Sequence, residues 1–294
     1  MGAPVDAIDA GLKGLSQAHL VAFVSQTSLS ALKGLASKEL KGRSLTEAVS
    51  ILFPEYSPAQ TDQLARQLAL TAFRNSCWKV VAEVPAPMTL VIRTPDEAAT
   101  LALRKHQGPA ILAFWHFGAV NMLLLGFRRI GISPLVITRA EPCRWVSSEE
   151  MMKQRISVAD GDTRAKTAAL RRSVQHLKRG GMISVAIDGS LGNHDVAVPF
   201  LGRQFSVSRG AAGLSRITGA PIIPCTMQWE PDGWNMAIRV FDALPRPAAS
   251  PDDAEAFEHE LMTSAARCFE QYAEQNPGQL RLDQFAKLVD APRL

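Results

Sequence analysis

The sequence predicts an α/β protein in which helices sandwich a mixed, mostly parallel sheet. From residue 110 onward, short apolar runs typical of strands alternate with amphipathic segments typical of helices. The composition agrees, because the 294 residues are 47% hydrophobic and 20% charged, which is enough to build one large core or one core with an appendage. No internal repeat or low-complexity tract interrupts this pattern.

Residues 1–100 form the predicted N-terminal helical portion. In the run from residue 57 to 84, Leu64, Leu68 and Phe73 recur at roughly helical intervals. Ser57-Pro58 is a typical helix start, because serine caps the backbone and proline suits the first helical position. The segment 19–36 is also amphipathic, and we expect it to pack on the core, with a membrane surface as the alternative.

Residues 101–250 form the predicted α/β core, and residues 251–294 a helical segment that packs on it. A helix is expected from residue 163, with Leu170, Val174 and Leu177 on one face and a Gly-Gly end at 180–181. Another is expected from residue 252 to 275. The expected strands are 110–115, 134–139, 182–188, 222–229 and 236–241.

The positive charge is concentrated in the predicted core. Residues 101–250 carry nineteen basic and ten acidic side chains, whereas residues 1–100 carry nine of each and residues 251–294 carry four basic and nine acidic. Such a field attracts an acidic partner: a phosphate, an acidic carrier protein or an anionic membrane face. A basic but merely solvated surface is the alternative.

Several function classes lack the motifs that they require. No P-loop, G-x-G-x-x-G or G-x-S-x-G appears, and aromatic residues are only 6% and do not interleave with the basic ones. We therefore expect no nucleotide, no nucleic-acid partner, no metal and no bound cofactor. No run of 18 apolar residues and no secretory signal is present, and the four cysteines are scattered. These features predict a cytoplasmic protein, with a peripheral position on the inner face of the cytoplasmic membrane as the alternative.

His116 is the first candidate for catalysis. It directly follows the predicted strand 110–115, and ligands of α/β sheets bind outside the carboxyl ends of strands. A histidine there can act as general base on a hydroxyl or an amine. Asn121 follows five positions later.

The motifs around His116 form an ordered series. H-F-G-A-V-N runs from His116 to Asn121, V-I-T-R ends at Arg139, and L-K-R-G-G-M-I-S-V-A-I-D-G contains Asp188. Then come V-P-F-L-G-R-Q-F-S-V-S-R-G, with Phe200 and Arg209, and I-T-G-A-P-I-I-P-C. The series resembles the bacterial lipid A biosynthesis late acyltransferases, part of the glycerol-phosphate acyltransferase-like group, over roughly residues 45 to 285.

The resemblance implies an acyltransferase with a glycerol-phosphate acyltransferase-like fold. It implies transfer from a thioester, with an acyl carrier protein as the expected donor, to a hydroxyl or amine, without a covalent enzyme intermediate. Coenzyme A or an aminoacyl-tRNA as donor stays open. We expect a small metabolite or a carrier-bound intermediate as acceptor, as in specialised metabolism, because the family's membrane-anchoring helix has no full-length counterpart here. A membrane glycolipid like lipid A and a non-catalytic acyl- or carrier-binding protein are the alternatives.

The family carries Asp or Glu where this chain has Asn121. An asparagine can still orient the imidazole, but the negative charge that strengthens the base is absent. Glu141 or Asp188 could supply the missing carboxylate, and Asp188 is otherwise expected to orient its own loop.

The remaining predicted site residues concern binding. Arg139 is a candidate anion clamp, or else the partner of an acidic side chain such as Glu141. Arg209 stands at a predicted helix start that favours a negative group, and Asp188 and Phe200 belong to the predicted substrate-binding set. For docking of a carrier protein we expect a cationic helix face, unless it is simply solvated. That face consists of Arg164, Lys166, Arg171, Arg172, Lys178 and Arg179.

Overall fold

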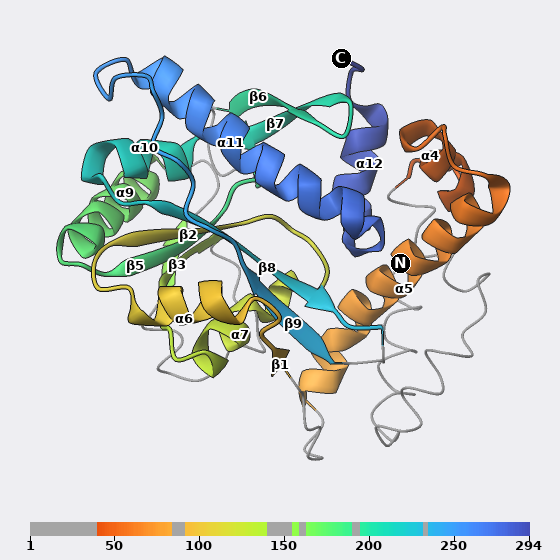
Figure 1. The fold of residues 1–294 in the computed structure, drawn as a ribbon, viewed down its shortest axis with the longest axis horizontal. Helices are drawn as coiled ribbons and strands as arrows, with labels where there is room; N and C mark the ends of the chain where they lie inside the picture. Colours follow the sequence, from red (N-terminus) through yellow and green to blue (C-terminus); the bar gives the residue numbers. More distant parts are fainter. Residues whose placement is uncertain (1–39, 84–91, 140–154, 159–162, 190–194, 232–234) are drawn as a thin grey trace.

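The computed structural model describes residues 40–83, 92–139, 155–158, 163–189, 195–231 and 235–294. Within them, helices cover both faces of a seven-stranded sheet, and a separate two-stranded hairpin packs beside one of the covering helices (Figure 1). The predicted fold class is thereby confirmed. The helix expected at 19–36 and the candidate carboxylate Glu141 lie outside the described residues.

The large sheet is parallel except at one place. Its strands run in the order β1-β9-β8-β2-β5-β3-β4, and only the β8/β9 pair is antiparallel. All five expected strands are present, and β1 and β4 add to them. The strands are β1 (Ile92–Arg93), β2 (Ala110–Phe114), β3 (Leu135–Arg139), β4 (Arg155–Val158), β5 (Met182–Ala186), β8 (Ile222–Trp229) and β9 (Met236–Val240).

The hairpin was not expected from the sequence. Strands β6 (Asp195–Phe200) and β7 (Arg203–Ser208) pair antiparallel, with buried and exposed residues in strict alternation. Leu201 and Gly202 connect them, both with positive φ (50° and 66°), as a tight two-residue hairpin requires. The period-two pattern V-x-V-x-F was the signal, and the buried face of β6 packs against α11 (Ala254–Gln275).

The helices divide between the two faces of the sheet. α9, α10 and α11 lie on one face, and α6 and α7 contact strands β8 and β9 from the other side (Figure 1). α12 lies beside α4 and α5, although these segments are far apart in the chain. Among the described residues, no helix is both long and apolar enough to cross a membrane. Besides α11, the helices are α4 (Leu45–Leu52), α5 (Pro58–Glu83), α6 (Glu97–Lys105), η1 (Val120–Met122), α7 (Leu123–Arg129), α9 (Thr163–Lys178), α10 (Gly210–Thr218), η2 (Pro277–Gln279) and α12 (Leu282–Asp290).

Helix boundaries follow the local signals in the sequence. α5 begins at Pro58, and the Ser57 hydroxyl accepts a hydrogen bond from the Gln60 amide at 3.4 Å. α11 begins after Asp253, whose carboxylate accepts from the Ala256 amide at 3.1 Å. α9 ends before Gly180, which has a positive φ of 82°.

An aromatic cluster centred on Trp115 anchors the end of β2. Trp115 is fully buried, and its ring lies 4.3 Å from Phe200, 5.4 Å from Phe205 and 5.8 Å from Phe269, measured between centroids. Each such ring pair contributes about 0.5–1.5 kcal/mol beyond its buried area. The cluster therefore holds firmly the residue that directly precedes His116. Phe200, which the sequence placed in the substrate-binding set, is fully buried in this cluster and serves the core.

Candidate active site

Strand register brings His116 and Asp188 together. β2 and β5 are parallel neighbours, with Phe114 opposite Ala186. His116 and Asp188 each follow two residues later, so both emerge at the same carboxyl edge of the sheet. Ligands of parallel sheets bind at that edge.

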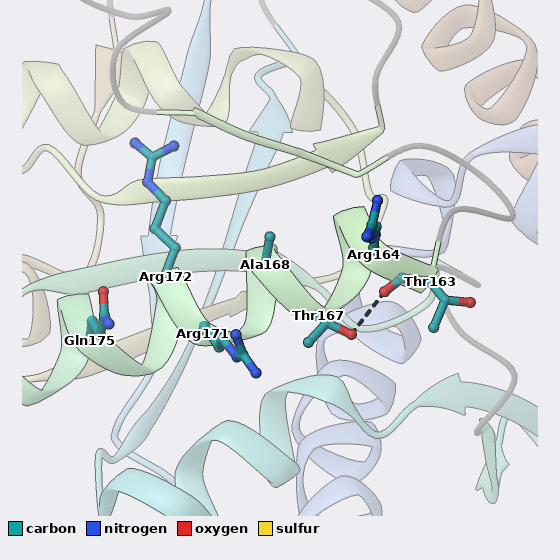
Figure 2. Close-up of a pocket in the computed structure, with 7 residues that line it drawn as sticks. All are labelled: Thr163, Arg164, Thr167, Ala168, Arg171, Arg172 and Gln175. Carbon is teal, nitrogen blue, oxygen red and sulfur yellow. Dashed lines mark hydrogen bonds between the residues drawn. The ribbon is translucent and has the colours of Figure 1, made fainter.

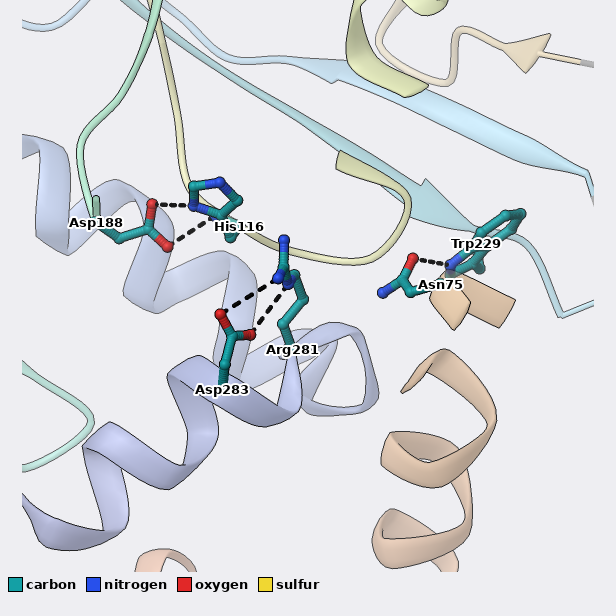
Figure 3. A network of polar contacts seen from close by, with 6 residues as sticks. All are labelled: Asn75, His116, Asp188, Trp229, Arg281 and Asp283. Atoms are coloured by element: carbon teal, nitrogen blue, oxygen red, sulfur yellow. Dashed lines mark hydrogen bonds and ion pairs between the residues drawn. The ribbon is translucent and has the colours of Figure 1, made fainter. Parts of the chain in front are cut away.

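Asp188 holds His116 through two hydrogen bonds. Its Oδ1 lies 2.6 Å from the histidine Nδ1, and its Oδ2 accepts from the histidine backbone N–H at 2.9 Å (Figure 3). The Asp188 side chain is 0% exposed, whereas the His116 side chain is 27% exposed. A carboxylate that accepts from Nδ1–H selects the tautomer whose Nε2 carries the lone pair. His116 is thus oriented by a buried group while its ring reaches solvent.

Asn121 is not the partner of His116. It lies in η1 with an exposed side chain, and although the structure describes both residues, no hydrogen bond joins them. Of the two carboxylates considered as substitutes for position 121, the structure places Asp188 against the histidine. Asp188 therefore orients the histidine, and its place in the predicted substrate-binding set stays a prediction.

The turn after His116 depends on Gly118. Its φ is +41°, and a Cβ there would lie 2.7 Å from the Met227 carbonyl oxygen and 2.9 Å from the Gln228 Cα. No other residue fits so close to this backbone. The approach allows the Gly118 amide to donate to the Gln279 carbonyl at 2.6 Å and the Ala119 amide to donate to Met227 at 2.8 Å. The histidine loop is therefore fixed to β8 and to η2.

A largely apolar cavity lies at the carboxyl end of β5, which leads to Asp188. β3 and β5 pair only where Leu135 faces Ile183 and Val136 faces Ser184. The cavity has a volume of about 370 Å³ and lies beneath α9 and α10, where β3 and β5 no longer pair. Its wall includes Ile137, Val185, Ala186, Ala169, Leu170 and Leu214.

Gly189 connects the cavity with the histidine. A Cβ at Gly189 would lie 3.7 Å from the Ala186 Cβ and 3.9 Å from the His116 Cε1. Ala186 also forms part of the cavity wall, so only Gly189 lies between that part of the wall and the imidazole, although His116 itself does not line the cavity.

Charged groups also line this cavity. Glu258 is 6% exposed and pairs with Arg216 (Nε to Oε1, 3.0 Å) and with Arg209 (Nη1 to Oε2, 3.7 Å). Arg209, a member of the predicted binding set, precedes α10 and lines the cavity, and part of its charge is engaged by Glu258. Lys166, on α9, completes this polar part of the wall.

The predicted cationic face lies on the solvent side of α9. Arg164, Arg171 and Arg172 line a shallow open hollow of about 690 Å³ together with Thr167 and Gln175 (Figure 2). The remaining cations are distributed around this face: Lys178 and Arg179 are exposed near the helix end, and Lys166 faces the cavity. One helix therefore separates a cationic surface from an apolar interior.

Arg139 ends β3, where Val158 of β4 is its pairing partner, and its side chain lies outside the described residues. Its backbone nevertheless stands at the carboxyl edge of the sheet, two residues beyond Ile137 in the cavity wall.

Arg281 lies next to the pair, and no motif in the sequence had pointed to it. An isolated antiparallel bridge joins Phe117 to Leu280, which sets His116 opposite Arg281. The Arg281 side chain is 28% exposed and pairs with Asp283. Only the folding of the C-terminal segment onto the histidine loop reveals this neighbour, because neither segment is part of a named strand at that point.

Comparison with known families agrees with this geometry. The profile described as bacterial lipid A biosynthesis acyltransferase matches residues 51–281, well over half of the chain. The chain belongs to this family. A search of curated proteins found no match.

The lipid A biosynthesis acyltransferase family transfers acyl groups, so this chain is an acyltransferase that takes an acyl donor and an acceptor. The resemblance based on the ordered motifs is confirmed. In this acyltransferase the matched region includes His116, Asp188, the cavity and, as its last residue, Arg281.

Proposed function

We propose that the protein transfers an acyl group from a thioester, carried by an acyl carrier protein, to a hydroxyl or amine, with His116 as general base. One observation carries the proposal: a solvent-reaching imidazole is held by a buried carboxylate, that of Asp188, two residues after Ala186 in the wall of an apolar cavity. The family membership supports acyl transfer, and the arrangement supports the roles of the side chains.

The proposed step uses the Nε2 lone pair of His116. Nε2 takes the proton from the acceptor while the acceptor atom attacks the thioester carbonyl carbon, whose π pair moves to oxygen. The pair then returns, the C–S bond breaks, and the thiolate takes the proton from the imidazolium. Asp188 stabilises the imidazolium through Nδ1, and no acyl-enzyme, metal or bound cofactor is needed for this sequence of events.

The cavity and α9 suggest where the donor lies. An acyl chain fits the apolar space between α9, α10 and the separated ends of β3 and β5, with its carbonyl end near Gly189. A carrier protein with an acidic surface suits the cationic hollow on the other side of α9.

Asp188 also changes what we expect of the acceptor. The amide at position 121 suggested a weakened base and an easily deprotonated acceptor, but Asp188 supplies the carboxylate. A hydroxyl is therefore as accessible to this base as an amine.

The test measures thiol release from an acyl carrier protein in the presence of three acceptor classes: soluble amines, soluble alcohols, and glycolipid presented in detergent micelles. We expect acceptor-dependent release by the parent and a loss of about 10²-fold or more in His116→Ala, because general base catalysis contributes that much. The class that stimulates release identifies the acceptor, and stimulation by the glycolipid alone would favour the membrane alternative.

His259→Ala is the matched control, because His259 is an exposed histidine on α11. It should behave as the parent does. Thermal unfolding checks that both variants fold. Equal turnover by folded His116→Ala and the parent would refute the assignment of the base.

A further inference from the structure

The loop after His116 uses all of its backbone donors. The His116 amide donates to Asp188, Phe117 to Trp115 (2.7 Å), Gly118 to Gln279 (2.6 Å), Ala119 to Met227 (2.8 Å) and Val120 to Phe117 (3.0 Å). Acyl transfer creates negative charge on the thioester oxygen, and preorganised donors usually meet that charge. Along residues 116–120 no amide can do so without breaking a bond of the fold, so a donor must come from another segment.

Arg281 is placed to be that donor. The bridge between Phe117 and Leu280 and the hydrogen bond from Gly118 to Gln279 tie the two segments together at successive positions. Figure 3 shows the Arg281 side chain extending from the start of α12 toward the loop that carries His116. The segment that pairs with the histidine loop at this sheet edge thus carries a cation.

The guanidinium has a donor group that its ion pair does not use. Nε and Nη2 donate to the two oxygens of Asp283, at 3.1 and 3.3 Å, which leaves the Nη1 hydrogens outside this pair. Arg281 precedes α12, yet its side chain makes no capping hydrogen bond to the helix. A partly exposed ion pair of this kind contributes little to stability, so the fold itself has little need of this arginine.

We propose that Arg281 is a catalytic residue that donates from Nη1 to the thioester carbonyl oxygen as it becomes an oxyanion. This inference rests on the proposed function. As the acceptor atom bonds to the carbonyl carbon, the π pair moves onto oxygen and the hydrogen bond from Nη1 strengthens, without proton transfer. When the electron pair returns to the carbonyl carbon, the C–S bond breaks and the hydrogen bond from Nη1 weakens again. The thiolate then takes the proton from His116.

The first test separates kcat from KM in Arg281→Gln and Arg281→Lys. Loss of one oxyanion donor lowers kcat by about 10²- to 10³-fold, so we expect that loss in the glutamine variant with KM within about threefold of the parent. The kcat of the lysine variant should lie between those of the parent and the glutamine variant, and at least about tenfold below the parent. An ammonium keeps the charge but lacks the planar fork of donors. Lys287→Gln, which removes an exposed cation from the same helix, should match the parent.

Two outcomes would overturn the proposal. One is a parent-like kcat in either Arg281 variant. Thermal unfolding shows whether the glutamine variant folds, and if it does not, the lysine variant alone decides. The other is a loss confined to the KM of the acceptor, which would instead make Arg281 a binding group for an acceptor anion.

A binding measurement distinguishes failure of this inference from failure of the proposed function. Dodecylphosphonate carries charged tetrahedral oxygens on an apolar chain, and calorimetry should show at least about tenfold weaker binding to Arg281→Gln than to the parent or to Lys287→Gln. Equal binding by all three overturns the role of Arg281, even if thioester turnover depends on His116. Binding that depends on Arg281, without any thioester turnover, would support an anion-binding site at Arg281 and refute the proposed function.

Discussion

Asp188 binds both the ring and the backbone of His116, and this double contact distinguishes it from Asn121. Because the carboxylate is fully buried and only 2.6 Å from Nδ1, the ring cannot turn without losing a charge-assisted hydrogen bond. Asn121 is exposed on η1. At the scale of single residues, the orientation of the proposed base therefore depends on an interaction between two strand ends and not on a short motif.

Exchanging amide and carboxylate tests this arrangement. Asp188→Asn should lower kcat by about 10²-fold or more, because an asparagine that donates to Nδ1 favours the wrong tautomer and no longer stabilises the imidazolium. The kcat of Asn121→Asp should stay within about threefold of that of the parent, since position 121 does not contact the His116 ring. Steady-state kinetics at saturating donor measures both.

The two variants control for each other, because each changes one polar side chain near the same loop. A parent-like kcat in Asp188→Asn would contradict the role of Asp188, and a large gain in Asn121→Asp would show that a carboxylate at position 121 can assist the base.

At the scale of elements, α9 is the helix that lines two different surfaces. Ala169 and Leu170 line the apolar cavity, whereas Ala168 and Arg171, one residue to either side, belong to the open cationic hollow (Figure 2). The 100° step between successive helical residues produces this division. Substitutions one position apart should therefore affect different parts of the donor.

Ala169→Leu should shift the preferred acyl chain toward shorter lengths. Three added carbon atoms would reduce a cavity of about 370 Å³ that we propose holds the chain. Ala168→Leu, with the same added atoms on the exposed neighbour, should leave the preference unchanged. Competition among acyl donors of graded length measures the preference, and an identical profile in both variants would exclude the cavity as the acyl site.

Arg171→Glu should weaken use of an acyl carrier protein and spare a small thioester. We expect kcat/KM for the carrier-bound donor to fall by about tenfold at low salt, because a like charge then faces the acidic partner, and the difference should shrink at high salt. Acyl-pantetheine should be used equally well.

The control for this prediction is Arg267→Glu, the same charge reversal at an exposed position on α11. If it lowers carrier-dependent kcat/KM as much as Arg171→Glu does, the effect belongs to net charge and not to the α9 surface.

At the scale of the whole molecule, the C-terminal helix closes onto the start of the described chain. Asp290, at the end of α12, accepts from Lys41 at 2.7 Å and from Arg43 at 2.6 Å, just before α4. These hydrogen bonds hold the pKa of Asp290 below its ordinary value. The same closure brings Arg281 and the residues before it against the histidine loop.

Asp290→Asn should destabilise the protein only where the carboxylate is ionised. Because its pKa is lowered in the folded state, its contribution is present above the unfolded pKa of about 3.9 and is lost as pH falls through the lowered value. We expect a loss of less than about 1 kcal/mol at pH 7, because the pair is partly exposed, with the difference disappearing in strong acid.

Urea unfolding of parent and variant between pH 7 and pH 3 measures that difference. Asp252→Asn, at an exposed position before α11, is the control and should follow the parent throughout. A constant difference at every pH would contradict the electrostatic explanation.

The sequence by itself determined the local elements. Apolar periodicity located the strands that begin at Ala110, Met182 and Ile222, and Ser57-Pro58 located the start of α5, because these features depend on residues only a few positions apart. It also placed His116 at the end of a strand. The hairpin around Leu201 was predictable by the same reasoning, since its alternation is equally local.

Only the tertiary structure decided which residues surround His116. The strand order puts β2 beside β5 and thereby selects Asp188 as partner, and the packing of the C-terminal segment adds Arg281. Strand order and the docking of a distant segment depend on how all the apolar faces of the chain are buried together. No window of neighbouring residues encodes that outcome, so the motif from His116 to Asn121 pointed to the proposed base but not to the group that holds it.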